Sequence, residues 1–359
     1  MKLSDVCTKG TSNIAQKDLD ARNGTYPIYG ASGFIKNVDF YHQEKPYIAI
    51  VKDGAGVGRV MQLPAKSSVI GTMQYIIPNE GVSVEYLAYA LEHMNLSKYY
   101  LGAAIPHIYF KDYCSETLPN HTPEEQAHIS HVLGLVSNLI FLRKQQLSKL
   151  DELVKSQFIE MFGDRGHSSN KVCLEEISDF VTVGIANSAT HAYADSGIVM
   201  LRNQNIKENY LDENDLIYIT PDFAQKYGSK QLAENDILVI RTGYPGVACL
   251  VPKKYEGCQT FTTLIVRLKD STLAHANYVC HYINSSFGKD YVEQSKVGVA
   301  QQNFGAKALA KMPIVIPSME LQEQFAKFVE QTDKSKFEIQ KSLEKLETLK
   351  KALMQKYFG

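Results

Sequence analysis

The sequence lacks the short motifs that mark the common catalytic classes. Its 12 prolines never form a Pro-Pro pair, which excludes the Asn/Asp-Pro-Pro-aromatic motif of adenine methyltransferases. It contains no Glu-x-Lys or Asp-x-Lys, so the common nuclease core is absent, and it contains no G-x-x-x-x-G-K-[ST] loop. No Ser, His and Asp residues stand in the context of a known catalytic family. The sequence therefore predicts a protein that is not an enzyme.

Long apolar runs and paired cysteines are also missing. No stretch approaches the ~18 uncharged apolar residues that cross a bilayer. The first ten residues, MKLSDVCTKG, lack the apolar core of a signal peptide. The six cysteines are dispersed without a Cys-x-x-Cys pair, which excludes a disulfide framework and a cysteine zinc site. We expect a cytoplasmic protein with reduced thiols and no membrane partner.

The chain has no excess of charge of either sign. Residues 1–121 hold 11 basic and 11 acidic side chains, and residues 166–317 hold 14 and 15. This balance argues against a nonspecific polyanion binder. A DNA-binding function would need local basic patches, or partner proteins that neutralise most of the phosphates. With 359 residues and 44% hydrophobic composition, the chain is expected to form two or three domains with true cores.

Two similar stretches, residues 122–163 and 318–359, divide the sequence and close it. Each follows an apolar-Pro pair, carries a glutamine early on (near Gln126 and Gln324), and ends in Phe-Gly. Each is rich in Leu, Lys, Glu and Gln, with no proline after the first turn. This composition predicts one helix per stretch, roughly 60 Å long at ~1.5 Å per residue.

Apolar residues recur in both helices at steps of three and four, which predicts the seam of a coiled coil; a pair of ordinary core helices is the alternative. Thr122 and Ser318 are the expected N-caps, and Glu125 completes a capping box in the first helix. The expected seam residues are Leu139, Leu142, Leu147, Leu150 and Phe158 in the first helix, and Ile339, Leu343, Leu346 and Leu353 in the second.

The segments before the two helices repeat an order of elements. Each holds a strand, a glycine-rich turn, a second strand and a proline, in PYIAIVKDGAGVGRVMQLP and DILVIRTGYPGVACLVP. The first departs from G-x-G-x-x-G, and a proline follows where a dinucleotide fold needs a helix, so we expect β-hairpins and no cofactor loop. Gly54, Gly56, Gly243 and Gly246 are expected to shape turns rather than to contact a ligand. A Thr/Gln strand, a short amphipathic helix and a glycine-led loop follow in both segments.

In this order, the chain resembles the specificity subunit of type I restriction-modification systems along essentially its full length. Order and duplication carry the resemblance rather than any one motif. The first segment departs from the second, because it lacks the leading strand and the LRNQNI-like stretch. The matching segments are YPIYGASG (residues 26–33), IVKDGAGVGRV (50–60), VMLRNQNI (199–206), NDILVIRTGYPG (235–246), the loops at Gly102 and Gly298 that run into LPNHTPEEQ and IPSMELQEQ, and the tail LETLKKALMQKYFG.

The resemblance implies an α+β fold, in which two long antiparallel helices form a coiled coil and separate two β-rich target-recognition domains in a pseudo-twofold internal repeat. The domains are expected at residues 1–121 and 166–317, and the spacer helices at 122–165 and 318–359. Each domain would read one half of a split double-stranded DNA target.

The resemblance also implies partners that carry the chemistry. The helices would dock two methyltransferase (M) subunits, and restriction (R) subunits would join them. The complex would be a DNA adenine methyltransferase and an ATP-dependent deoxyribonuclease. This chain would hold no cofactor, because S-adenosylmethionine, ATP and Mg would be bound by the partner subunits.

Base-reading side chains are expected among the polar residues of turns and loops. Arg and Lys suit guanine, Asn and Gln suit adenine, and Thr contacts the thymine methyl group. For any one residue, a solvated or structural role is an equal alternative. The candidates are Tyr29, Ser32, Lys36, Lys52, Arg59, Thr72, Gln74, His107 and Tyr109 in the first half, and Arg202, Asn203, Gln204, Asn205, Lys207, Arg241, Tyr244, Gln259, Thr260, Gln301, Gln302, Asn303 and Lys307 in the second.

Two further interpretations were weighed. The near-zero charge favours a scaffold whose helices join two protein partners without reading DNA, whereas the repeated order of segments favours a DNA-specificity subunit. His128 and His131 lie near Glu124 and Glu125 at a spacing that suits a metal. A solvated helix face explains them better, so no metal site is expected.

Overall fold

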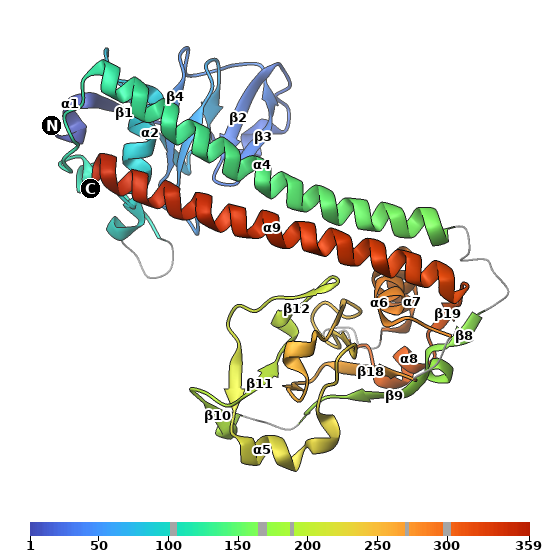
Figure 1. Cartoon of the computed structure of the whole chain (residues 1–359). Coiled ribbons are helices and arrows are strands. Elements are labelled where there is room, and N and C mark those ends of the chain that lie inside the picture. Colours follow the sequence, from blue (N-terminus) through green and yellow to red (C-terminus); the bar gives the residue numbers. More distant parts are fainter. Residues whose placement is uncertain (101–105, 164–170, 187–189, 270–272, 297–302) are drawn as a thin grey trace. The chain divides into compact units, whose positions relative to one another are not determined.

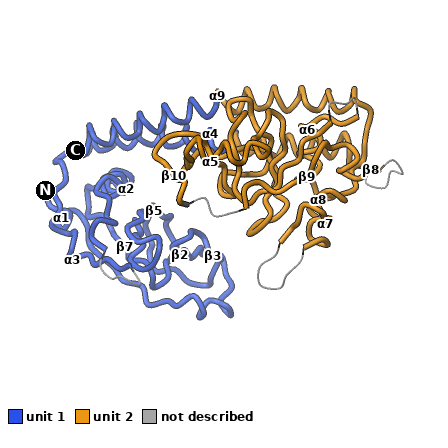
Figure 2. Tube along the Cα trace, turned by 90° about the horizontal axis from the view of Figure 1, so that it is seen from below, with its two compact units in different colours: residues 1–146, 339–359 blue, residues 147–338 orange. Residues whose placement is uncertain are grey.

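The computed structural model of the chain describes residues 1–100, 106–163, 171–186, 190–269, 273–296 and 303–359. These residues form two compact units (Figure 2). Unit 1 comprises residues 1–146 and 339–359, and unit 2 comprises residues 147–338. Among the described residues, no helix is long and apolar enough to cross a membrane.

Unit 1 is organised around an antiparallel sheet in the order β1-β7-β4-β5 (Figure 1). Strand β4 is buried along its whole length, because its apolar side chains pack alternately into clusters on the two faces of the sheet. A smaller sheet has the order β3-β2-β6. The elements are α1 (Leu3–Val6), β1 (Cys7–Thr11), η1 (Gln16–Leu19), β2 (Tyr26–Gly30), β3 (Gly33–Val38), β4 (Tyr47–Val51), β5 (Val60–Leu63), β6 (Ser68–Val69), β7 (Met73–Pro78), α2 (Val84–His93), η2 (Leu96–Tyr99) and α3 (Phe110–Tyr113).

Unit 2 has a main antiparallel sheet in the order β16-β15-β18-β9, a second sheet in the order β10-β14-β11-β17, and the pairs β12-β13 and β19-β8. Its elements are β8 (Lys171–Cys173), η4 (Leu174–Ile177), β9 (Ser178–Val183), η5 (Thr190–Ala192), β10 (Tyr193–Ala194), β11 (Ile198–Leu201), η6 (Asn203–Asn205), β12 (Ile206–Lys207), β13 (Tyr210–Leu211), β14 (Ile217–Ile219), α5 (Pro221–Lys226), η7 (Gly228–Lys230), β15 (Ile237–Val239), β16 (Ala248–Leu250), η8 (Lys253–Tyr255), β17 (Gln259–Thr260), β18 (Leu264–Leu268), α6 (Ala276–Asn284), α7 (Ser286–Ser295), α8 (Ala306–Ala310) and β19 (Pro313–Val315).

The two glycine-turn segments are hairpins, as predicted. Strands β4 and β5 pair antiparallel, with Ala49 opposite Met61. Strands β15 and β16 do the same, with Leu238 opposite Cys249. No described residue of either segment forms the helix that a dinucleotide loop requires.

The prediction that the first segment lacks a leading strand is wrong, and strand β11, which leads into LRNQNI, has a counterpart in β2 although the two sequences differ. Strand β1 pairs with β7 at the edge of the main sheet, as β9 pairs with β18 in unit 2. Strand β2 pairs in parallel with β6, with Tyr29 opposite Val69, as β11 pairs with β17, with Leu201 opposite Thr260. Strand β1 has the polar sequence CTKGT, and only its first residue is buried. The hydrophobic pattern of the sequence therefore does not reveal this strand.

Both long helices form as predicted. Helix α4 covers Pro123–Phe162 and helix α9 covers Met319–Phe358. The first begins with the expected capping box: the Glu125 amide donates to Thr122 Oγ1 at 3.3 Å, and the Thr122 amide donates to Glu125 Oε2 at 2.8 Å. Each unit contains about half of each helix.

The halves pair antiparallel within each unit. In unit 1, Met354 packs with Ile129 and Leu133, while Lys144, further along α4, lies 2.9 Å from Glu347. In unit 2, the rings of Phe158 and Phe325 lie 5.4 Å apart, while Asp151 lies 2.7 Å from Lys336. The order of partners along one helix is therefore reversed along the other.

Around Leu139 and Leu142, the seam of α4 has a different phase from the predicted one. Leu139 and Leu142 are 46% and 44% exposed. The inward positions are offset by one residue, at Ile140 and Arg143, in a run of three- and four-residue steps that includes Leu133. The leucines suggested the wrong face, because a second apolar stripe lies beside the seam. The other expected seam residues are partly or fully buried: Leu147, Leu150, Phe158, Ile339, Leu343, Leu346 and Leu353.

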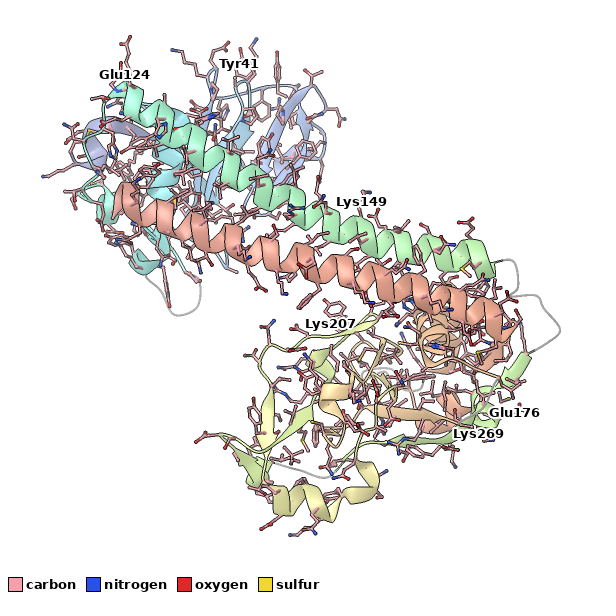
Figure 3. All side chains as sticks on the ribbon, viewed as in Figure 1. Tyr41, Glu124, Lys149, Glu176, Lys207 and Lys269 are labelled. Atoms are coloured by element: carbon pink, nitrogen blue, oxygen red, sulfur yellow. The ribbon has the colours of Figure 1, made fainter. Side chains whose placement is uncertain are left out.

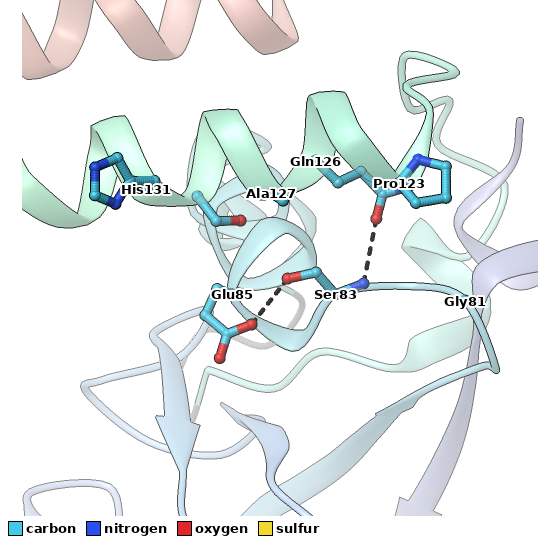
Figure 4. Close-up of a pocket in the computed structure, with 8 residues that line it drawn as sticks. Gly81, Ser83, Glu85, Pro123, Gln126, Ala127 and His131 are labelled. Carbon is cyan, nitrogen blue, oxygen red and sulfur yellow. Dashed lines mark hydrogen bonds between the residues drawn. The ribbon is translucent and has the colours of Figure 1, made fainter.

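One buried glutamine joins the start of each helix to its unit. In unit 1, Gln126 accepts from the Ser83 amide at 3.2 Å (Figure 4). It also donates to the His121 carbonyl at 3.0 Å. In unit 2, the equivalent residue is Gln322, which accepts from the His275 amide at 2.8 Å. The sequence suggested Gln324 instead.

The ends of the helices also repeat one contact. In unit 1, the ring of Phe358, at the end of α9, lies 5.3 Å from that of Tyr86 on α2. In unit 2, the ring of Phe162, at the end of α4, lies 4.8 Å from that of Tyr278 on α6. Each unit thus holds the beginning of one helix and the end of the other by the same kinds of side chain.

Candidate nucleic-acid interface

An inner strand of each main sheet, β4 in unit 1 and β15 in unit 2, runs into a glycine turn that is fixed by packing. We call this strand the central strand of its unit. Gly58 has φ +86°, and a Cβ atom there would lie 2.5 Å from the Ser97 amide nitrogen. Gly246 has φ +94°, and a Cβ atom there would lie 2.8 Å from a Val292 methyl group. Only glycine fits both the backbone and the space at these positions. The expectation that Gly246 shapes a turn is confirmed.

In unit 1, this turn gathers a cation, a carboxylate and a histidine. Lys52 Nζ lies 2.8 Å from Asp53 Oδ2, and His107 Nδ1 is hydrogen-bonded to Asp53 Oδ1. Burial raises the pKa of the Asp53 carboxyl, but hydrogen bonds from Lys52 and His107 outweigh burial and leave the pKa below its ordinary value. The His107 ring packs edge-on against Tyr109, with ring centroids 4.1 Å apart.

In unit 2, the corresponding turn gathers a cation and two asparagines. The side-chain nitrogen of Asn203, Nδ2, lies 3.3 Å from both the backbone carbonyl and the hydroxyl of Thr242, and it donates to them. Thr242 in turn forms a β-bridge with Asn303. Arg241 precedes Thr242 at the end of the strand. Three segments that are far apart in the sequence meet here.

Several side-chain atoms in these two clusters are covered by protein but bonded to no described residue. Such atoms are rare in folded proteins, because an unpaired buried polar group is costly. They are His107 Nε2 in unit 1, and Arg202 Nε, Asn203 Oδ1, Arg241 Nε and Asn303 Oδ1 in unit 2.

The remaining surface candidates surround the turns or lie on other loops. Arg59 donates to the Ala31 carbonyl at 2.9 Å, which places Ser32 beside the unit 1 turn, and the Thr72 carbonyl accepts from the Lys52 amide at 3.0 Å. Tyr244, at the tip of the unit 2 turn, is 82% exposed. The exposed candidates are Ser32, Arg59, Thr72, Tyr109, Gln204, Tyr244 and Lys307.

Four candidates are only partly exposed and already bonded or packed in their own unit. Lys36 donates to the Leu19 carbonyl at 3.0 Å, and the Tyr29 ring packs against Phe34. Lys207, on β12 (Figure 3), lies 3.8 Å from an oxygen of Asp212. Arg202 donates to the Asp215 carbonyl. The structure brings none of them into the two clusters through a direct contact, except that Arg202 adjoins Asn203 in the chain.

Four other candidates are buried, so their assignment to an exposed reading surface is wrong. Gln74 donates to the Tyr113 hydroxyl inside unit 1. Asn205, Gln259 and Thr260 have no exposed surface. Their side chains donate to backbone carbonyls of neighbouring segments, which is how a polar residue is accommodated in a core.

Two candidates, Gln301 and Gln302, lie outside the described residues. For His128 and His131, a metal pair is the less favoured interpretation of the sequence. In the described part of the chain, no group of three or more His, Cys, Asp and Glu side chains could hold a metal ion. His131 instead lines an open hollow of about 410 Å³ beside Gln126.

Sequence reasoning missed two members of the clusters, Asp53 and Thr242. Both directly follow the basic residue at the end of the central strand, and both bridge to the loop before the next helix, at His107 and Asn303. Their shared position in the repeat was a signal in the sequence. It could be used only once the two turns were aligned correctly.

Family-level sequence comparison matches residues 1–152 and 168–351 to the type I restriction modification DNA specificity domain. The chain belongs to this family. Members of the type I specificity family confer DNA specificity rather than catalysis, so the absence of catalytic motifs agrees with the family. Comparison with curated protein sequences gives no match.

Solved structures share the fold of this type I specificity protein. The S subunit of a type I restriction-modification system from M. genitalium is 14% identical, with a TM-score of 0.60, and the match covers 100% of this chain and 95% of that one. A chain from a structure that concerns complex assembly and conformational transition of the type I R-M system is also 14% identical, with a TM-score of 0.55, and the match covers 99% of this chain and 96% of that one. At this identity the likeness supports the fold, with its two α+β domains and long helices.

Proposed function

We propose that this chain is the S subunit that gives a type I restriction-modification complex its DNA sequence, each unit reading one half of a split double-stranded target. The observation that carries the proposal is the repeat of one polar cluster. At the same place in both units, a basic residue follows the central strand, and a polar residue of a later loop forms a β-bridge to the turn. Direct readout of bases needs such side chains on a rigid frame.

The proposed division of labour follows the repeat. Residues 1–121 and 166–317 are the reading domains, and residues 122–165 and 318–359 are the helical segments. The chain acts in the cytoplasm. The M subunits hold S-adenosylmethionine, and the R subunits hold ATP and Mg, because this chain carries no motif for either chemistry.

An apolar stripe on α4 supports docking of the M subunits. Leu135, Leu139 and Leu142 are spaced by four and three residues and are 53%, 46% and 44% exposed. This spacing places them on one face of the helix. Exposed leucines in a row are unfavourable in water and are typical of a protein interface. Two M subunits, one for each half of the repeat, complete the proposed complex.

The test is DNA binding by the purified chain, with and without its M partner. The balanced charge predicts weak binding alone and specific binding in the complex, where the partner supplies cations for the phosphates. Tight sequence-specific binding by the chain alone would contradict the need for a partner. A complex that forms but shows no sequence preference would instead favour a scaffold that only joins proteins.

Exchange of one reading domain is the second test. Replacing residues 1–121 with the matching domain of another family member is expected to change one half of the methylated sequence and leave the other intact. Methylome sequencing of cells with the hybrid complex measures this directly. A change in both halves would refute independent reading.

A further inference from the structure

We propose that His107 in unit 1 and Asn303 in unit 2 are equivalent specificity-determining residues, each discriminating one base in its own half of the target. This assignment rests on the proposed DNA-reading function and goes beyond it, because it names one position in the repeat and the base chemistry at that position.

The equivalence of the two positions comes from the backbone. His107 bridges to Asp53 and Asn303 bridges to Thr242, and each bridged residue directly follows the basic residue after the central strand, Lys52 or Arg241. The next residue in each case, Ile108 or Phe304, is fully buried.

The following amide is held in the same way in both units. The Ile108 amide donates to the Lys52 carbonyl at 3.0 Å, and the Phe304 amide donates to the Arg241 carbonyl at 3.0 Å. A buried side chain and a backbone bond thus fix the residue that follows His107 or Asn303, and we call the position of these two residues the slot. The slot itself holds different residues in the two units, a histidine and an asparagine.

Each slot residue carries an unsatisfied polar atom. His107 Nε2 and Asn303 Oδ1 are covered and bonded to no described residue, although both side chains are partly exposed. The His107 side chain, for example, keeps 24% of its surface accessible. A small reorientation toward an incoming base edge would give each atom a partner and remove an unfavourable state of the free protein.

The hydrogen-bonding capacity of each slot residue indicates the base that it can select. The ionised Asp53 carboxylate only accepts, so the proton of a neutral His107 ring lies on Nδ1 and Nε2 is an acceptor. An acceptor in the major groove selects the exocyclic amino group of adenine or cytosine. The amide of Asn303 can both accept from N6 and donate to N7 of adenine. The two half-sites are therefore read by different chemistry, and the target is asymmetric.

The adjacent cations have a different role in this proposal. Lys52 is paired with Asp53 at 2.8 Å, so it holds the carboxylate that orients His107. Arg241 occupies the same place beside Thr242, and its Nε atom is bonded to no described residue. Basic residues flanking a base-reading residue are suited to phosphates, which fix the register of the protein on DNA without adding sequence information.

The experiment exchanges the slot residues in the assembled complex. Complexes of the chain with its M subunits would be made with His107→Asn or with Asn303→His, and incubated with DNA in which both half-sites are randomised. Sequencing of the bound fraction gives the preference at every position. We expect His107→Asn to raise the preference for adenine at one position of one half-site, because asparagine can bond both N6 and N7 of adenine. We expect Asn303→His to reduce the preference for adenine at one position of the other half-site.

The expected change is roughly 5- to 150-fold in relative binding of the two bases, equivalent to about 1–3 kcal/mol at ~1.4 kcal/mol per tenfold. Matched controls make the same chemical exchanges at exposed sites outside both clusters, with His191→Asn and Asn37→His. These controls are expected to leave both half-sites unchanged.

Three results would overturn the assignment. One is an unchanged preference in either exchange variant, and another is an equal loss of binding at every position. The third is loss of a whole half-site in His107→Asn and also in the longer His107→Gln, which would show that the residue only supports the fold. If the unmodified complex has no sequence preference at all, the proposed function fails instead, and that result is distinguishable from the other three.

Discussion

Replacing Gln322 with alanine is expected to destabilise unit 2 more than the equivalent change at Gln126 destabilises unit 1. Gln322 is fully buried. It accepts from the His275 amide at 2.8 Å and donates to the Leu273 and Pro317 carbonyls at 3.0 Å each. Alanine removes all three bonds and leaves three backbone groups without the partner that Gln322 supplied. Each such group costs about 1–3 kcal/mol when water cannot reach it, so we expect a loss of about 3 kcal/mol.

The same change at Gln126 should cost about 1 kcal/mol. Its two bonds, to Ser83 and His121, are similar in length. However, Gln126 lines an open hollow of about 410 Å³ (Figure 4), so water can replace the lost side chain. Two residues in one structural role thus differ in the number of bonds they make and in the access of water to those bonds.

Native-state hydrogen exchange measures the two effects separately, because the helix beside each glutamine reports on its own unit. The opening free energy of α6 should fall in Gln322→Ala, and that of α2 should fall in Gln126→Ala. The undisturbed unit of each variant is the control. Gln322→Glu keeps the acceptor and loses the amide donor, so its opening free energy for α6 should lie between those of the wild type and of Gln322→Ala. Equal losses in the two alanine variants, or a larger loss at Gln126, would refute the argument from burial.

Three other predictions follow from the described contacts. Burial and the charge of Lys336 hold the pKa of His281 at about 3, so the unfolded chain binds a proton that the folded chain does not between about pH 6.5 and 3. The contribution of His281 to the free energy of unfolding should therefore be complete above about pH 6.5 and fall by up to about 1.4 kcal/mol per pH unit below it. In His281→Phe, urea titrations between pH 4 and 7 should show a free energy of unfolding that depends less steeply on pH. An unchanged slope would exclude this residue as the cause. Leu139→Lys should weaken binding of the M subunit at least tenfold in calorimetry while changing the free energy of unfolding by less than about 0.5 kcal/mol. Gln145→Lys, a nearby exposed control, should change neither quantity. Normal binding by Leu139→Lys would refute the proposed docking face. Four residues inserted after both Gln146 and Glu338 add about 6 Å to each helix and should lengthen the gap between methylated half-sites by one or two base pairs at ~3.4 Å each; an active complex with an unchanged gap would show that the helices do not set it.

The repeated order of elements could be predicted from the sequence, but the exact phase of the helices could not. The correct seam passes through Ile140 and Arg143, and an arginine in a seam does not attract attention when leucines lie one residue away. Leu139 and Leu142 have the right spacing for a seam and the wrong face. Spacing defines a stripe on a helix, whereas the partner that covers the stripe is a property of the tertiary structure.

The candidate site shows a similar limit. A polar residue in a short strand and a polar residue in a loop look alike in the sequence. Gln259 and Thr260 are buried because β17 lies in the interior, where their side chains replace missing backbone bonds. Asp53 is not predicted from the sequence, because a carboxylate rarely reads bases and the residue types that suit them are mostly basic or amide side chains. Its importance depends on a hydrogen bond to a residue more than fifty positions away, and local patterns contain no information on such a pair.

The arrangement of the two clusters bears on how a specificity protein can acquire a new target without losing its fold. Ile108 and Phe304 anchor their loops by burial and by one amide bond to the end of the central strand. The residue before each anchor is only partly covered, so replacing it removes little buried apolar area and changes stability less than a core substitution does. Gln259 and Thr260 are in the opposite situation, because every change there breaks internal hydrogen bonds. New specificities should therefore arise first at the slots of His107 and Asn303. A selection for altered half-sites from randomised libraries should recover folded variants at these two positions and none at Gln259 or Thr260.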